Sequence, residues 1–177
     1  MTFNPDIHHR HSPRLRGYDY SQSGAYFITI CTYNRQCLFG EIVNGAMRLN
    51  EFGEMVNNEW LKTPRIRHEI ILDSHVVMPN HFHAVVILRR GDRPVAPTNN
   101  TSGPKPRSIG SLVAGFKFSV TKGINETRKM HGVPVWQRNY YEHVIGDDDD
   151  LNRIREYIEY NPARWAEDEE NPSRIKL

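Results

Sequence analysis

The sequence lacks the features of a membrane or secreted protein. None of its 177 residues belong to a run that approaches the roughly 18 apolar residues needed to span a bilayer. The N-terminus has no apolar signal core. Only two cysteines are present, Cys31 and Cys37, without the spacing of a disulfide framework. These absences predict a cytoplasmic protein that does not associate with a membrane and whose cysteines pack as small hydrophobic side chains.

A strong net charge is also lacking, since the formal value is only +2. The distribution of charge is more informative than the total. The segment before Tyr18 carries three arginines and one acidic residue, whereas acidic residues gather late, at 147–150 and 167–170. This asymmetry favours a basic end that faces a polyanion, although a merely solubilising arm would have the same composition.

The length predicts a single domain over residues 1–177, with residues 1–20 as a basic N-terminal arm and the proline-containing segment 91–107 as a flexible loop. Strands are predicted at 26–32, 70–78 and 81–88, brief extended segments at 37–39 and 47–49, and an extended aromatic stretch at 133–145. Helices are predicted from the cap Asn50 to Pro64, from the cap Ser108 onward, and from 147–150 to Asn161. This order predicts an α+β fold: a ferredoxin-like antiparallel sheet with helices on one face and an added C-terminal helix that carries Tyr157.

The chain is organised around a predicted hairpin, ILDSHVVMPNHFHAVVIL, in which Pro79-Asn80 supplies the turn. Side chains alternate across a strand, so His81 and His83 share one face and Phe82 points to the other. Two neighbouring imidazoles on a sheet make half of a metal site.

The C-terminal helix offers the complementary groups. Leu151, Ile154 and Ile158 form its apolar stripe, and Tyr157 and Asn161 lie one turn apart at the edge of that stripe. A docked helix therefore presents a phenol and a carboxamide to the sheet. If they meet the strand histidines, the result is a metal held by two imidazoles and an amide oxygen, with a phenol alongside.

Four segments, YDYSQSGAYFITICTYNR, VVMPNHFHAVV, VWQRNYYEHVI and IREYIEYNPARW, resemble those of the REP-associated tyrosine transposases, which are relatives of the single-tyrosine insertion-sequence transposases in the HUH nuclease superfamily. The resemblance runs from about Arg14 to Trp165. It implies a metal-dependent nuclease and strand transferase specific for single-stranded DNA, acting at hairpins of palindromic repeats, whose tyrosine keeps the 5′ phosphate and releases a 3′-OH.

The resemblance also implies roles for individual residues. Tyr157 would be the nucleophile, His81 and His83 metal ligands, and Asn161 the third ligand, at a position where related insertion-sequence enzymes have Gln. The expected cofactor is Mg²⁺ or Mn²⁺; two imidazoles favour Mn²⁺. No general base for Tyr157 is evident from the sequence. The protein is expected to act as a monomer or homodimer.

Contacts to the single-stranded or hairpin DNA are expected from arginine and lysine side chains that bind phosphates and from aromatic rings that stack on bases. The candidates for phosphate contacts are Arg14, Arg16, Arg35, Lys105, Arg107, Lys117 and Arg138, and those for stacking are Tyr18, Tyr20, Trp136 and Tyr140.

Other interpretations stay open. His81 and His83 would also suit ordinary hydrogen-bonding roles, Tyr157 packing, and Asn161 the end of a helix before Pro162. A zinc hydrolase would need a third ligand at recognisable spacing, which the sequence does not offer, and histidine-phosphate transferases would want a third alternating histidine where Val85 stands. A domesticated protein that binds DNA hairpins without cutting them is the main alternative.

Overall fold

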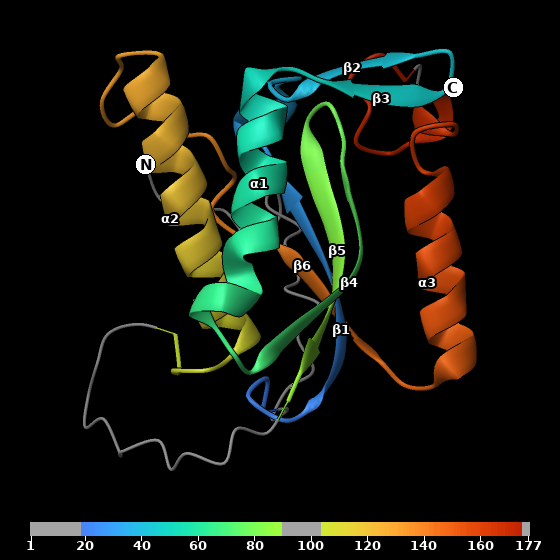
Figure 1. Ribbon diagram of the computed structural model, residues 1–177. Coiled ribbons are helices and arrows are strands. Elements are labelled where there is room, and N and C mark those ends of the chain that lie inside the picture. Colours follow the sequence, from blue (N-terminus) through green and yellow to red (C-terminus); the bar gives the residue numbers. More distant parts are fainter. Residues whose placement is uncertain (1–18, 90–103, 175–177) are drawn as a thin grey trace, which may run out of the picture.

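The computed structural model describes residues 19–89 and 104–174 (Figure 1). Its strands are β1 (Gly24–Cys31), β2 (Gly40–Val43), β3 (Ala46–Leu49), β4 (Ile70–Val77), β5 (His81–Leu88) and β6 (Tyr141–Ile145). Its helices are α1 (Glu51–Ile66), α2 (Ile109–Thr127) and α3 (Asp148–Tyr160), with short 3₁₀ helices at Tyr33–Arg35 and Trp165–Glu167. Nearly all of the predicted arm (1–20) and most of the predicted loop (91–107) lie outside the described residues.

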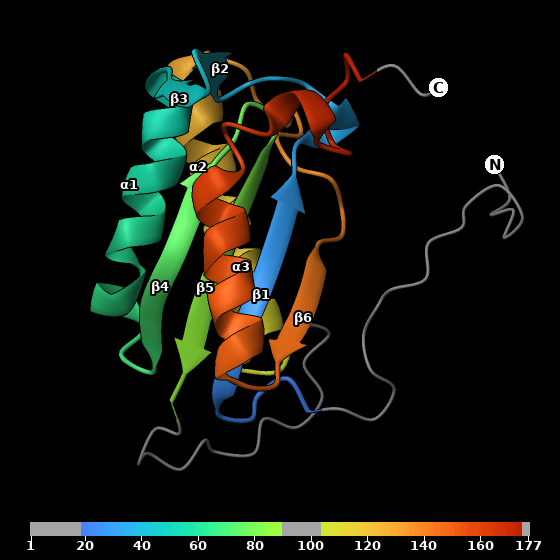
Figure 2. The same ribbon diagram turned by 90° about the vertical axis from the view of Figure 1, so that its right-hand side faces the viewer.

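Four strands form an antiparallel sheet in the order β4-β5-β1-β6, and β2 and β3 form a separate hairpin. Helices α1 and α2 cover one face of the four-stranded sheet, and α3 covers the other (Figure 2). The chain order strand, helix, strand, strand, helix, strand, with β1 between β5 and β6, is the ferredoxin-like arrangement. The predicted fold class is therefore confirmed, including the added C-terminal helix.

The pleat of β5 divides the apolar side chains between two cores. Phe82 faces α1 and α2, and its ring centroid lies 4.9 Å from that of Trp60. Val85 faces α3 and packs in a smaller cluster with Phe27 and Ile158. Because side chains alternate along the strand, both histidines of β5 lie on the α3 face, as predicted.

The two helix caps predicted from the sequence, Asn50 and Ser108, are present, and Asp147 caps the third helix at the predicted acidic start. The Asn50 side chain accepts hydrogen bonds from two backbone N–H groups of α1. Ser108 and Ser111 form a reciprocal capping box at the start of α2. Asp147 accepts from the Asp150 backbone N–H at 2.8 Å, which fixes the start of α3. Each cap satisfies an N–H group that has no partner inside its helix.

The end of α1 differs from the prediction. The helix continues past Pro64 to Ile66, and the Arg67 N–H still reaches the Thr63 carbonyl. A proline in the last turn removes one hydrogen bond without ending the helix, because few further turns depend on it.

Two predicted extended segments were also wrong in their bounds. Residues 37–39 are not a strand; β2 begins at Gly40 and pairs with β3 across a turn in which Asn44 and Gly45 both have positive φ, the geometry of a two-residue hairpin. Of the stretch 133–145, only Tyr141–Ile145 is a strand, because the earlier part contacts the sheet through the single bridge between Thr32 and Trp136.

Cys31 and Cys37 are both free thiols. No helix in the described ranges is long and apolar enough to cross a membrane.

Candidate functional site

The two histidines of β5 lie side by side under α3, with ring centroids 4.5 Å apart, and both are buried. The Asn80 carboxamide oxygen lies 2.9 Å from His81 Nδ1, so that nitrogen carries the proton. The Thr29 hydroxyl lies 2.8 Å from His83 Nδ1. These contacts occupy the rear nitrogen of each ring and leave both Nε2 atoms for the site, which is the way metal-binding histidines are oriented in proteins.

The turn before β5 is itself rigidly held. The Asn80 side chain is fully buried and donates from Nδ2 to the backbone carbonyls of Arg35, at 3.1 Å, and Glu170, at 2.7 Å. Its own carbonyl accepts from the Thr32 N–H at 2.8 Å. The residue that orients His81 is therefore bonded to two separate segments of the chain, residues 32–35 and Glu170.

Burial keeps both imidazoles neutral. It lowers the pKa of His81 to about 4, although the nearby Asp168 carboxylate opposes that shift. Burial also lowers the pKa of His83 well below its usual value. Neutral imidazoles have a lone pair to offer a cation at neutral pH.

Tyr157 and Asn161 project from the last turn of α3 and its cap toward these histidines. The Tyr157 hydroxyl lies 3.3 Å from His83 Nε2, and its ring packs edge-on against Phe27. Tyr157 is 43% exposed and, with Asn161 and Asp168, lines a cavity of about 310 Å³. Asn161 is buried and donates from Nδ2 to the Asp168 carboxylate at 3.1 Å.

Asp168 is the group at this site that sequence reasoning missed. Beyond Pro162 the chain turns back through the 3₁₀ helix Trp165–Glu167, which brings the buried Asp168 carboxylate to 3.9 Å from His81 Nε2. His81, His83 and Asp168 each offer a ligand atom, and these atoms all lie within 4.8 Å of one another. No local pattern distinguishes Asp168 from the acidic residues beside it, because only the turn after α3 makes it face inward.

The electrostatics of the site disfavour a free phenolate. Burial raises the pKa of Tyr157 to about 12, and the negative charge of Asp168 adds to the shift, while a hydrogen bond with Asn161 opposes it. The phenol is therefore protonated at neutral pH until positive charge is added to the site.

Two buried polar atoms lie at the site without a hydrogen-bond partner, His81 Nε2 and Asn161 Oδ1. Orphaned buried polar atoms are costly and rare. Together with His83 Nε2 and the Asp168 carboxylate, they offer nitrogen and oxygen ligands of the kind that a divalent cation takes. The residues present therefore fit a metal ion.

Two side-chain pairs bind α3 to the sheet, one close to Tyr157 and one near the start of the helix. Arg155 binds the Asp73 carboxylate of β4, where a register shift between Leu72 and His75 interrupts the pairing with β5. At the other end of the helix, His143 of β6 contacts Asp150 at 2.8 Å. Helix α3 is thus bonded to β4 and β6, the two strands that flank β5 and β1 in the sheet.

Other tyrosines do not share this position. Tyr160 is 47% exposed, and its ring lies 6.0 Å from the Arg164 guanidinium. Tyr141 packs 6.2 Å from Phe27 on the α3 face, and Tyr140 lines a cavity on the opposite face. Of the tyrosines that the structure describes, Tyr157 is the one whose hydroxyl contacts a histidine of the pair.

The predicted DNA-contacting residues fall in different places. Arg14, Arg16 and Tyr18 lie outside the described residues. Arg35 is paired with Glu170 at 3.0 Å, and Arg107 lies in the turn before α2 with positive φ. Lys117 and Arg138 line the cavity that Tyr140 also faces.

Trp136 requires a correction. Its ring is buried, 5.0 Å from the ring of Phe39 and 6.0 Å from that of Phe116. An indole enclosed in the core has no face for an unpaired base, so its predicted stacking role does not hold in this structure. In the sequence Trp136 belongs to an aromatic run. In the structure its backbone forms an isolated antiparallel bridge with Thr32, and its ring lies in the core.

Comparison with known proteins shows which proteins this chain is similar to. No family model matches the chain. The chain is 39% identical over 178 residues to an uncharacterised protein of Haemophilus influenzae, covering 94% of this chain and 96% of that one. It is 27% identical over 150 residues to a protein of the same organism named "Putative REP-associated tyrosine transposase", covering 82% of this chain and 74% of that one.

A solved structure shares the fold. It is a REP-associated tyrosine transposase bound to a REP hairpin, with a TM-score of 0.56 and 20% sequence identity, covering 94% of this chain and 77% of that one. This chain has the fold of that transposase, with paired histidines under a helix that carries a tyrosine. In sequence and in fold it is similar to REP-associated tyrosine transposases, as its sequence segments predicted.

Proposed function

We propose that this protein is a metal-dependent endonuclease and strand transferase for single-stranded DNA. It acts at hairpins of palindromic repeats through a covalent 5′-phosphotyrosine on Tyr157. The observation that carries the proposal is the 3.3 Å contact between the Tyr157 hydroxyl and His83 Nε2, beside two buried atoms that have no partner. The similarity to REP-associated tyrosine transposases supports a DNA-processing role.

The proposed metal ligands are His81, His83 and Asn161, with Asp168 as an added carboxylate. A divalent ion held by these residues, Mg²⁺ or Mn²⁺, would polarise the scissile phosphate and supply positive charge to the site. Asp168 opposes ionisation of the phenol when it faces Tyr157 alone. A cation bound beside Asp168 would cancel the repulsion between its carboxylate and the Tyr157 phenolate. Asp168 could then bind the cation without disfavouring ionisation of Tyr157.

Tyr157 is the proposed nucleophile of the covalent step. Its phenol loses a proton as its oxygen attacks phosphorus, the bond from phosphorus to the 3′ oxygen breaks, and the departing oxygen takes up a proton to become a 3′-OH, so the step consumes no net proton. The phosphotyrosine conserves the phosphodiester bond, because a free 3′-OH can attack it and release the phenol. One tyrosine thus accounts for both cleavage and rejoining, one strand at a time.

The solved relative was bound to a REP hairpin, and this supports hairpin DNA as the proposed substrate here. Arg35, whose positive charge acts on His81, is the proposed phosphate contact at this site. Residues 1–177 are proposed to act as one domain, as a monomer or homodimer.

The test is capture of the covalent intermediate. Labelled single-stranded palindromic DNA is incubated with protein and Mn²⁺ or Mg²⁺ and run on a denaturing protein gel. We expect a shifted adduct that is lost in Tyr157→Phe and on chelation, while DNA binding persists. Tyr160→Phe, three residues along the same helix and exposed, is the matched control and should retain the adduct.

The alternative function has its own signature in this assay. A hairpin-binding protein that does not cut would bind the DNA and give no adduct with either metal. An adduct that survives in Tyr157→Phe would reassign the nucleophile.

A further inference from the structure

Arg164 lies on the same side of the last helical turns as Tyr157 and Asn161. The three residues are spaced i, i+4 and i+7, which places them within about 60° of one another around a helix axis. Helix α3 ends at Tyr160, but the Arg164 N–H still donates to the Tyr160 carbonyl at 3.1 Å, so the backbone keeps helical spacing up to this arginine. Arg164 also lines the cavity of about 310 Å³ that Tyr157 and Asn161 line. The arginine therefore shares a cavity with the proposed nucleophile.

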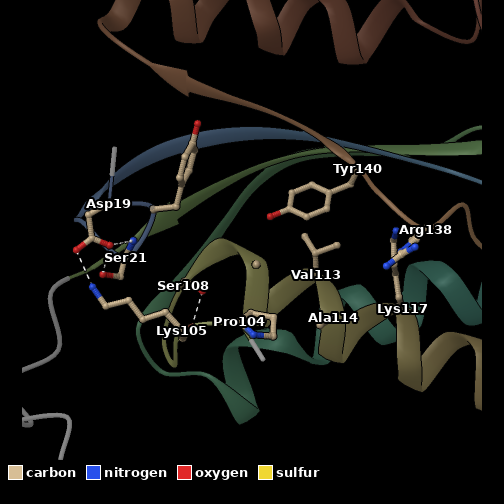
Figure 3. A pocket seen from close by; sticks show the side chains of 12 residues that line it. Asp19, Ser21, Pro104, Lys105, Ser108, Val113, Ala114, Lys117, Arg138 and Tyr140 are labelled. Carbon is tan, nitrogen blue, oxygen red and sulfur yellow. Dashed lines mark hydrogen bonds and ion pairs between the residues drawn. The ribbon is translucent and has the colours of Figure 1, made fainter. Parts of the chain in front are cut away.

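A larger cavity, of about 470 Å³, lies on the other face of the sheet, along α2 (Figure 3). Tyr157 does not line it, and its Lys105 is paired with Asp19 at 2.8 Å, as a dashed line in Figure 3 shows. A phosphate that Tyr157 attacks has to enter the smaller cavity instead. The charges of the smaller cavity therefore bear on the proposed reaction.

The smaller cavity would repel a phosphate without Arg164. Of its six lining residues, Arg164 carries the only positive charge, and three others are acidic: Glu167, Asp168 and Glu169. Asp168 accepts from the Asn161 amide at 3.1 Å and is a proposed ligand of a divalent cation, which would balance its charge. Glu167 and Glu169 are exposed, so water and salt screen them. Arg164 is thus the positive charge that the protein itself offers to a phosphate in this cavity.

The Arg164 guanidinium has no ion-pair partner within the described part of the chain. It is exposed and lies 6.0 Å from the Tyr160 ring, in a cation–π contact that does not cancel its charge. Arg35, by contrast, is already paired with Glu170 at 3.0 Å. A guanidinium without a carboxylate partner can bind two oxygens of one phosphate at once.

We propose that Arg164 binds a non-bridging oxygen of the scissile phosphate and stabilises the negative charge that builds up there as Tyr157 attacks. The guanidinium stays protonated throughout, since arginine is not deprotonated in proteins, so the proton balance of the step is unchanged. Arg164 is then a catalytic residue in addition to the nucleophile and the metal ligands. The proposal rests on the proposed function for the reaction at Tyr157.

The first test measures the rate of adduct formation in a single turnover, with saturating hairpin DNA and Mn²⁺. Arg164→Gln should lower this rate about 10²- to 10³-fold, the usual effect of removing one donor to a developing oxyanion. Arg164→Lys keeps the charge but not the forked geometry, and should recover about tenfold of the loss. Mn²⁺ affinity without DNA and Tm should stay as in the wild type, because a merely structural arginine would change these instead.

Arg153→Gln is the matched control, because Arg153 is an exposed arginine of α3 that does not line the cavity. It should leave the rate of adduct formation unchanged. A rate for Arg164→Gln equal to that of the control would overturn the proposal. A loss of rate accompanied by an equal loss of Mn²⁺ affinity would do so as well.

The second test locates the phosphate that Arg164 contacts. A methylphosphonate, in which an uncharged methyl group replaces one non-bridging oxygen, is placed in turn at each position of the single-stranded DNA. Binding is followed by fluorescence anisotropy in the Tyr157→Phe background, where no adduct is expected. Arg164→Gln should weaken binding of the unmodified DNA about five- to tenfold but cause no further loss at one methylphosphonate position. That position should be the bond that the wild type cuts.

The two tests distinguish this proposal from the proposed function. If the wild type forms no adduct, the proposed function fails, while a single coupled methylphosphonate position still supports Arg164 as the phosphate contact of the cavity. Losses that add at every position, or coupling at a phosphate other than the one that is cut, would overturn the role of Arg164 even if Tyr157 is the nucleophile.

Discussion

Arg155 donates hydrogen bonds from Nε and Nη2 to the two carboxylate oxygens of Asp73, at 2.9 and 2.6 Å. The pair joins α3 to β4, two residues before Tyr157, at the irregularity in β4 between Leu72 and His75. A bidentate pair fixes orientation as well as distance. It therefore sets where the tyrosine lies over the histidines.

Removing this pair should affect the reaction more than binding. Asp73→Asn is expected to slow adduct formation about tenfold and to lower Tm by about 2–4 °C, a small shift for a domain of this size. DNA affinity should be unchanged, because neither residue contacts the proposed DNA sites. Single-turnover rates and anisotropy give the two readouts.

Arg153→Gln is the control for this experiment, since Arg153 is exposed and pairs only within α3, with Asp150. It should leave the rate of adduct formation as in the wild type. If Asp73→Asn were as fast as this control, the pair would have no positioning role.

The same pair predicts a pH dependence of stability. Hydrogen bonds from Arg155 are the main reason that the pKa of Asp73 is lowered to about 2, from a usual value of about 3.9. Because the folded-state pKa lies below the unfolded value, the contribution of this carboxylate is complete above about pH 4 and is lost as the pH falls toward 2. The difference in free energy of unfolding between wild type and Asp73→Asn should be constant near neutrality and shrink below about pH 4. Denaturant titrations at several pH values measure it, and a difference that grew on acidification would contradict the assignment.

Asp168→Asn should have opposite effects on the phenol and on the cation. Without metal, loss of the carboxylate charge is expected to lower the pKa of Tyr157 from about 12. With metal, loss of a ligand should weaken Mn²⁺ binding by about tenfold or more. Ultraviolet titration, taken as the difference from Tyr157→Phe, gives the first quantity, and calorimetry gives the second. Glu167→Gln, an exposed neighbour, should change neither.

Thr29→Val tests the orientation of His83. The substitution keeps the shape of the side chain on β1 but removes the hydroxyl that contacts His83 Nδ1. Loss of such a supporting contact typically costs 10- to 100-fold in metal affinity. Mn²⁺ should therefore stabilise the variant less than the wild type at equal concentration, as seen in thermal unfolding. Equal stabilisation would mean that His83 is held by packing alone.

The features that the sequence predicted are those encoded locally. The hairpin around Pro79-Asn80, the caps and the alternation of His81, Phe82 and His83 all depend on residues close together in the chain. Tyr157 and Asn161 are four residues apart, and this spacing likewise predicted that they lie on the same side of α3. Local periodicity and capping chemistry were sufficient for these elements.

What could not be predicted depends on contacts between distant segments. Asp168 reaches His81 because the chain reverses after α3, and Arg155 reaches Asp73 because α3 packs across β4, 82 residues away in the sequence. Neither contact is indicated by a periodic pattern in the sequence. Trp136 was misassigned for the same reason, since nothing local indicates that its ring is enclosed by Phe39 and Phe116.

Tyr140 and Tyr141 are consecutive, yet the first lines the larger cavity and the second packs beside Phe27 on the α3 face. They stand at the start of β6, one of the two edge strands of the sheet. DNA that contacts both faces of the sheet and also reaches Tyr157 has to wrap around this border. The number of nucleotides between hairpin and cut would then be set by the path around one short strand, and shortening the single-stranded DNA below that number should abolish cutting at once rather than gradually.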